Sequence, residues 1–137
     1  MERRWCKLTA SDLIDQLLVN EQLVSLLATD PHGNPALYQI LSPEAEVFPR
    51  IALYEFDRDY TRFADDIPIE ESIEFRIDMY ARENILRDLN AALHNAMRQL
   101  GFRRAGQVQD GYIEEFDIYV KSATYEIKEQ LPFNGTK

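Results

Sequence analysis

The stretch SIEFRIDMY, residues 72–80, decides the fold of this chain. Every second residue of it is apolar, namely Ile73, Phe75, Ile77 and Met79. This alternation is typical of a strand that buries one face and exposes the other. Apolar residues then recur at intervals of three and four from Glu83 to Leu100, which predicts a long helix with one apolar side. Because the two apolar surfaces can bury each other, the sequence predicts a helix packed on a sheet.

An earlier helix is indicated where Thr9 precedes Asp12 by three positions, the spacing of an N-terminal capping box. An apolar stripe with helical spacing follows from Leu13 to Leu27. The pair Asn20-Glu21 interrupts this stripe. One helix to about Ala28 and two short helices therefore remain as alternatives.

Further strands are predicted on both sides of the central pair. They are Leu37–Leu41, Arg50–Phe56, Phe102–Val108 and a final strand in which Tyr125 and Ile127 share one side. Asp110-Gly111 is expected to form a turn between the last two. For Tyr112 to Val120, a bulged strand and a single helical turn both remain open. The aromatic residues expected to fill the core are Tyr54, Phe56, Phe75 and Tyr125.

These elements predict an α+β fold, in which a mainly antiparallel sheet of four to five strands packs against two helices and carries one long polar loop. The length of 137 residues fits a single domain over residues 1–137. Residues 1–8 and 131–137 are expected to be flexible termini. The one cysteine, Cys6, suits a reducing compartment, and no apolar run approaches the roughly 20 residues that cross a bilayer. We therefore expect a soluble intracellular product with no membrane partner.

The net charge of -9 is concentrated in two segments. One runs from Asp57 to Glu71 and holds six carboxylates against two arginines. The other runs from Asp110 to Asp117 and holds four carboxylates and no base. Such acidic surfaces repel nucleic acid and attract basic partner surfaces. A DNA-binding function is therefore disfavoured, since it depends on cations that neutralise phosphates.

The polar segment from Asp57 to Ser72 contains Tyr60, Phe63 and Ile67 at irregular intervals, which predicts no regular element. A loop of this length in a compact domain usually has a function, or is a pair of extended arms. Aromatic residues beside arginine and aspartate resemble the anchors of protein interfaces. We therefore expect a protein interface here. Its candidate residues are Asp57, Arg58, Asp59, Tyr60, Arg62, Phe63, Asp65 and Asp66.

The sequence offers few residues for chemistry. His32 lies in a turn, His94 lies off the apolar side of its helix, and Cys6 has no base beside it except a lysine, so all three are expected to be non-catalytic. The acidic pairs Asp65-Asp66 and Glu70-Glu71 are candidate ligands for a divalent cation, but their spacing matches no calcium loop. No phosphate-binding glycine loop, nucleophile elbow or zinc-ligand spacing is present. The sequence predicts no catalytic, cofactor-binding or metal-binding residue and therefore no enzyme; a metal-dependent hydrolase built on the acidic pairs is a minor alternative.

From about Leu13 to Glu129 the chain resembles the family of siphophage tail completion proteins, the small tail-to-head joining proteins. The segments that carry the resemblance are the N-terminal amphipathic helix, FPRIALY at residues 48–54, the polar segment, IEFRIDMYAR at residues 73–82, the long helix ending in LGF at residues 100–102, and the closing strand at residues 123–129.

The resemblance implies a structural role at the head-proximal end of a long phage tail. Related tail terminators form six-fold rings that cap the tail tube and face the head connector. The resemblance therefore implies three kinds of partner: further copies of this chain in a ring of six on the tail, the tail tube protein, and a head completion or connector protein. DNA would pass nearby without being bound specifically. The implied location is the virion, at the head-tail junction, after synthesis in the host bacterial cytoplasm.

The alternative is a small cytoplasmic adaptor or regulatory protein without catalytic activity, for which a dimer through a sheet edge is one arrangement. The two hypotheses differ in oligomer symmetry and in whether the protein attaches to a tail tube.

Overall fold

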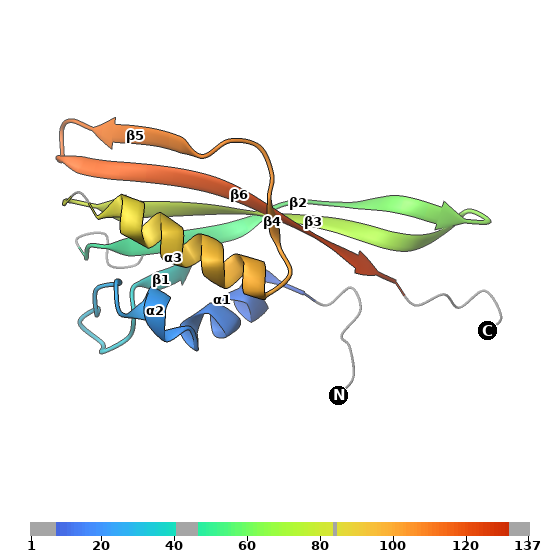
Figure 1. Ribbon diagram of the computed structural model, residues 1–137, viewed down its shortest axis with the longest axis horizontal. Coiled ribbons are helices and arrows are strands. Elements are labelled where there is room, and N and C mark those ends of the chain that lie inside the picture. Colours follow the sequence, from blue (N-terminus) through green and yellow to red (C-terminus); the bar gives the residue numbers. More distant parts are fainter. Residues whose placement is uncertain (1–7, 41–46, 84, 132–137) are drawn as a thin grey trace.

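The computed structural model describes residues 8–40, 47–83 and 85–131 (Figure 1). The elements, in chain order, are α1 (Ala10–Leu18), α2 (Glu21–Val24), β1 (Leu37–Gln39), β2 (Arg50–Ala64), β3 (Ile67–Ala81), α3 (Leu86–Gln99), β4 (Arg103–Arg104), β5 (Gln109–Ile113) and β6 (Ile118–Gln130).

The strands form one sheet in the order β1-β2-β3-β6-β4, and β5 also pairs with β6. The β1–β2 pair is parallel and all other pairs are antiparallel. Figure 1 shows the helices on one side of this sheet. The predicted α+β class is thereby confirmed. The described residues form six strands rather than four to five, because β1 and β4 are very short additions at the two edges.

The N-terminal helical region is two helices rather than one. Thr9 caps α1 through the predicted box with Asp12, since each backbone N–H donates to the other residue's side chain. Asn20 then caps α2, because its side-chain oxygen accepts from the backbone N–H of Leu23. The pair that interrupts the apolar stripe therefore starts a new helix.

The core lies between the helices and the inward side of β3. Ile73, Phe75, Ile77 and Met79 are all fully buried there. Phe75 makes an edge-to-face contact with Phe102, with ring centroids 5.9 Å apart. Tyr125 is also fully buried, as expected. The same prediction was wrong for Phe56, which is 51% exposed on the opposite face of the sheet.

Strand length explains the shape of the molecule. β2 and β3 each have 15 residues, which at about 3.3 Å per residue gives strands of roughly 50 Å. α3 has 14 residues and at about 1.5 Å per residue reaches only about 21 Å. The helices therefore cover only one end of the hairpin, and the other end projects from the body (Figure 1). We call this projecting hairpin, residues 57–72, the arm.

The arm replaces the long polar loop that the sequence predicted. The alternative of two extended arms is what the structure shows, with Asp65 and Asp66 as a two-residue turn at the tip. The pairing register of β2 with β3 shifts between Glu55 and Asp57, between Tyr60 and Arg62, and between Arg62 and Phe63. These β-bulges break the alternation of side chains, which is why the sequence pattern looked irregular.

The C-terminal third also differs from the prediction. Asp110 and Gly111 lie within β5 rather than in a turn, and the strand expected over Phe102–Val108 is reduced to the two residues of β4. The turn comes later, at residues 114–117, where Asp117 has a φ of 54°. Tyr112 to Val120 is thus the closed end of a hairpin, which neither alternative fully described.

Candidate assembly interface

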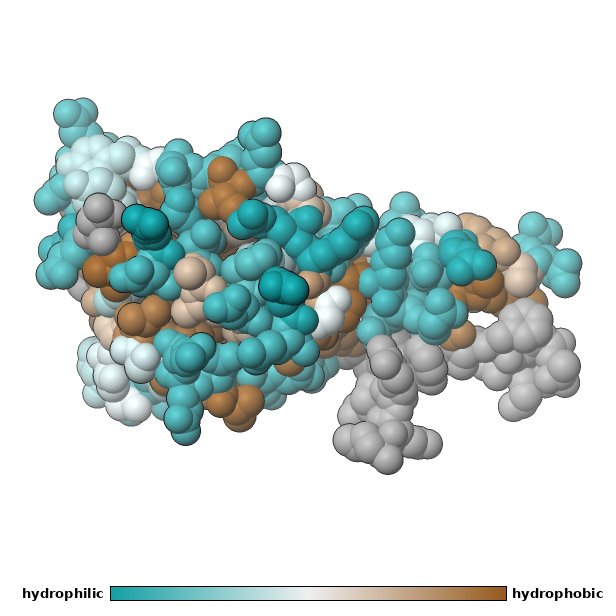
Figure 2. All heavy atoms as spheres, in the orientation of Figure 1, coloured by the Kyte–Doolittle hydropathy of each residue, from teal (hydrophilic) through white to brown (hydrophobic). Residues whose placement is uncertain are grey.

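Two aromatic side chains stand out on the arm. Phe63 is 58% exposed and Tyr60 is 49% exposed. Their rings touch edge to face, with centroids 6.3 Å apart. Figure 2 shows hydrophobic surface among hydrophilic side chains on this projection. Exposed aromatic residues of this kind are typical anchors of protein interfaces.

The tip of the arm is acidic. Asp65 and Asp66 have φ values of 51° and 65°, so both adopt the left-handed conformation of a type I′ turn. Within the described part of the chain, neither forms an ion pair. Their exposed carboxylates are therefore available to a binding partner.

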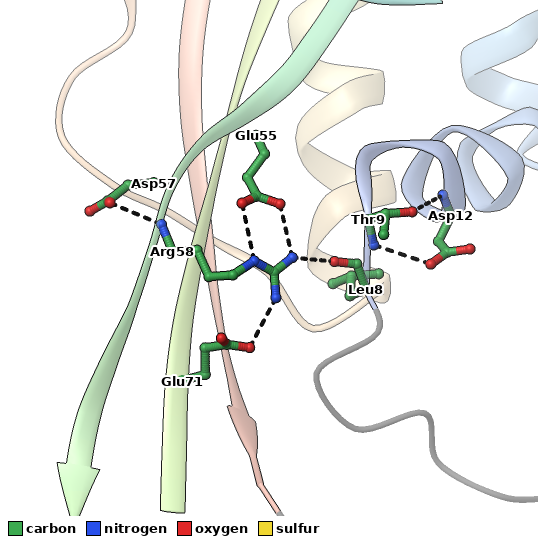
Figure 3. A network of polar contacts seen from close by, with 7 residues as sticks. All are labelled: Leu8, Thr9, Asp12, Glu55, Asp57, Arg58 and Glu71. Atoms are coloured by element: carbon green, nitrogen blue, oxygen red, sulfur yellow. Dashed lines mark hydrogen bonds and ion pairs between the residues drawn. The ribbon is translucent and has the colours of Figure 1, made fainter. Parts of the chain in front are cut away.

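Arg58, also a candidate interface residue, is engaged within the chain (Figure 3). Its Nε and Nη2 donate to the two carboxylate oxygens of Glu55 at 3.0 and 2.9 Å, and its Nη1 donates to Glu71 at 2.9 Å. Nη2 also donates to the backbone oxygen of Leu8, just before α1. Arg58 thus joins the base of the arm to the first helix and acts as an internal anchor.

The electrostatics of this anchor follow from the bidentate pair. Hydrogen bonds from Arg58 lower the pKa of Glu55, although burial partly opposes the change. The pKa of Arg58 is raised, mainly by the hydrogen bond to Glu55. Glu71 is only 5% exposed, so its charge depends on the arginine for compensation. The guanidinium therefore stays charged and fixed.

The ends of the described chain meet the same region. Leu8 accepts the hydrogen bond from Arg58, and the backbone N–H of Leu131 donates to the carbonyl oxygen of Ile69 at 2.9 Å. The other residues expected to be flexible termini, 1–7 and 132–137, lie outside the described residues, as does Cys6.

The face of the sheet opposite the helices is polar, and we call it the open face. A row of directly opposed residues crosses four strands there: Asp57, Glu74, Glu126 and Arg103. Three acids in one row repel one another. Arg103 donates to Glu126 at 2.9 Å, and Ser72 donates to the same carboxylate at 2.8 Å. The pKa of Glu126 is lowered, mainly by the hydrogen bond from Ser72 and further by Arg103, whereas burial opposes this change.

The candidate cation ligands do not converge. Asp65 and Asp66 occupy the tip, while Glu70 and Glu71 are successive residues of β3 and so point to opposite faces. Glu70 accepts a hydrogen bond from Thr61, and Glu71 is paired with Arg58. Among the described residues, no group of three or more acids, histidines or cysteines has the arrangement of a metal site.

His94 is not the isolated surface residue that the sequence suggested. Its Nδ1 lies 3.0 Å from the hydroxyl of Tyr125, so the two side chains are joined by a hydrogen bond. Burial lowers the pKa of His94, and the charges of Arg104 and Arg98 lower it further. The imidazole is therefore mainly neutral near pH 7.

Sequence reasoning missed the cluster that these contacts define. Arg98 at the end of α3 and Arg104 of β4 are both exposed. The charges of both lower the pKa of His94. Arg103, the neighbour of Arg104 in β4, lies on the open face and pairs there with Glu126 at 2.9 Å. We call the two arginines Arg98 and Arg104 the basic patch. The only signal in the sequence is their presence within residues 98–104 of an otherwise acidic chain.

None of the helices in the described ranges has the length and apolar content required to span a membrane.

Comparison with solved structures finds chains of similar fold. A chain of a gene transfer agent virion shares this fold. The matching structure is titled "Virion of native gene transfer agent (GTA) particle", and it matches with a TM-score of 0.56 at 16% sequence identity. The alignment covers 85% of this chain and 90% of the other. The match is therefore one of fold over nearly the whole of both chains. No protein-family model and no curated protein matches the sequence.

Proposed function

We propose that this protein is a structural virion component that completes the head-proximal end of a phage tail tube and joins the tail to the head connector. The observation that carries the proposal is the fold shared with a chain of a virion particle over 85% of this chain and 90% of that one. The sequence resemblance to siphophage tail completion proteins supports the finer assignment to the tail. The protein has no catalytic role in this proposal.

In the proposed assembly, copies of the chain form a closed ring, a hexamer on the tail, through heterologous contacts. The ring binds the tail tube protein on one side and a head completion or connector protein on the other. The net charge of -9 suits a passage through which DNA slides without being bound. The ring belongs to the virion at the head-tail junction and contacts no membrane.

The arm supplies the contact surface between subunits or toward the tube. Its exposed residues Tyr60 and Phe63 act as anchors, and Asp57, Asp59, Arg62, Asp65 and Asp66 form the charged surroundings. Arg58 contributes indirectly, because it fixes the base of the arm against α1. A projecting hairpin suits this role because the rings of Tyr60 and Phe63 contact each other and about half of each side chain stays exposed.

The test combines the purified protein with isolated headless tails and examines the mixture by electron microscopy. A ring seated on one end of each tail is the expected result. A second sample tests the anchors: the Phe63→Ser, Tyr60→Ser variant removes both aromatic rings from a surface that lies outside the core. This variant is expected to fold normally and to bind the tail end poorly.

A protein that remains monomeric or dimeric and ignores tails, heads and connectors contradicts the proposal. That outcome supports the alternative of a small cytoplasmic adaptor or regulatory protein.

A further inference from the structure

Charge is distributed unequally between the arm and the body. The arm carries six carboxylates and two arginines, and one of those arginines, Arg58, is already paired within the chain. The basic patch of Arg98 and Arg104 lies on the body. Opposite charges on two separate surfaces of one chain are complementary between copies.

A chain's own tip does not meet its own basic patch. Arg103 of β4 pairs with Glu126, which in turn pairs with Glu74 of β3. The tip turn immediately precedes Ile67, which lies seven residues from Glu74 on β3, about 24 Å at 3.4 Å per residue. Figure 1 shows β4 near the point where the arm leaves the body, with the tip directed away from it.

The backbone of the arm is also open to pairing. β1 lies beside β2 only from Ile51 to Leu53. Beyond Leu53, the outer edge of β2 has no strand beside it within the described residues. Exposed strand edges are places where another chain adds. β4, which carries Arg104 of the basic patch, lies at the opposite edge of the same sheet.

We infer that the acidic arm of one copy docks on the basic patch of the next copy. This inference rests on the proposed function, because it names the contact that closes the ring. The contact is heterologous, since two different surfaces meet, and repetition of it generates a ring where the rotation closes. Arg98 and Arg104 face the arm acids, and the exposed rings of Tyr60 and Phe63 enter the contact.

The test uses two complementary charge reversals. One variant is Asp59→Lys, Asp65→Lys, which reverses the arm. The other is Arg98→Glu, Arg104→Glu, which reverses the basic patch. All four side chains are exposed, so both variants are expected to fold, and urea denaturation checks this. Arg87→Glu is the matched control, because it makes the same reversal in an exposed residue near the other end of α3.

The measurement is the mass of each sample by light scattering and sedimentation at low and high salt. Each reversal alone is expected to weaken self-association by about tenfold or more, and Arg87→Glu to leave it unchanged. An equimolar mixture of the two reversed variants is expected to restore the oligomer. In an alternating ring of even number, every lysine arm meets a glutamate patch and every aspartate arm meets an arginine patch. High salt is expected to weaken the wild-type oligomer by screening the contact.

The inference is wrong if a reversed variant assembles as the wild type does, or if the folded variants do not restore the oligomer when mixed. It is also wrong if the wild type stays monomeric at the highest attainable concentration in low salt. These outcomes differ from failure of the proposed function. If the mixed variants restore rings but no ring binds isolated tails, only the assignment to the tail is contradicted. Normal seating of both reversed variants on tails contradicts the docking contact alone.

Discussion

The body and the arm use the same two strands in different ways. In the body, β2 and β3 bury Ile51, Leu53 and Ile77 completely beneath the helices. In the arm, the same strands expose Tyr60 and Phe63, and no helix of the described part covers them. The hydrogen-bonded ladder continues through both halves. The difference shows that burial specifies the body, whereas backbone pairing and the tip turn maintain the arm.

The largest expected difference in stability between the body and the arm comes from truncating one aromatic residue in each. Phe75→Ala removes a fully buried ring that packs on Phe102, and we expect a loss of about 3–5 kcal/mol in the free energy of unfolding. Phe63→Ala, in the arm, is expected to change it by about 0.5 kcal/mol or less. Urea denaturation measures both values. Equal losses would show that the arm belongs to the folding core.

The two arginines of the arm provide the next comparison. Arg58→Met leaves the carboxylate of Glu71 buried without its partner. We expect the free energy of unfolding to fall by about 1–3 kcal/mol. This loss is smaller than for a fully buried ion pair, because Arg58 is partly exposed to solvent. Arg62→Met, four positions along the same strand, is expected to cost about 0.5 kcal/mol or less. Thermal and urea unfolding test the difference. An Arg58→Met protein as stable as Arg62→Met would contradict the anchoring role.

The base of the arm is expected to contribute to the acid sensitivity of the protein. The folded pKa of Glu55 is depressed below its ordinary value of 4.5, chiefly by hydrogen bonds from Arg58. The unfolded chain therefore takes up the proton first as pH falls. The stability that this pair contributes is present above about pH 4.5 and is lost as pH falls through the folded pKa. Urea midpoints between about pH 6 and pH 3 are expected to fall less steeply in Arg58→Met than in the wild type.

The smallest expected effect concerns the tip. Asp65 and Asp66 both have positive φ values, which suit Asn-Gly in a two-residue hairpin turn. Asp65→Asn, Asp66→Gly is therefore expected to stabilise the arm by about 0.4–1 kcal/mol. Hydrogen exchange should show slower amides along the arm and unchanged amides in β3 beside the helices. Faster exchange in the arm would contradict the assigned turn.

The sequence predicted the elements whose side chains alternate or repeat cleanly. The alternation from Ile73 to Met79 and the capping box at Thr9 both identify elements that burial and local hydrogen bonds specify. The arm was harder, because its bulges change which face each residue occupies. The candidate residues were located in one segment, but their arrangement as a hairpin remained only an alternative.

The basic patch was missed for a different reason. Arg98 lies at the end of a helix, and Arg104 lies on a strand after an intervening turn. Only the fold places these side chains around His94 and Tyr125. No periodicity in the sequence predicts proximity between residues of two different elements.

The unbroken pairing of β3 with β6 has a mechanical consequence. Their register continues without a shift from Glu70, near the tip, to Ala81, deep in the body. Hydrogen bonds of antiparallel strands run perpendicular to the strands. A force applied along the arm therefore loads many of these bonds together in shear, instead of opening them one after another. β3, which contributes more buried residues than any other strand of the sheet, therefore also transmits tension from the tip of the arm to the body.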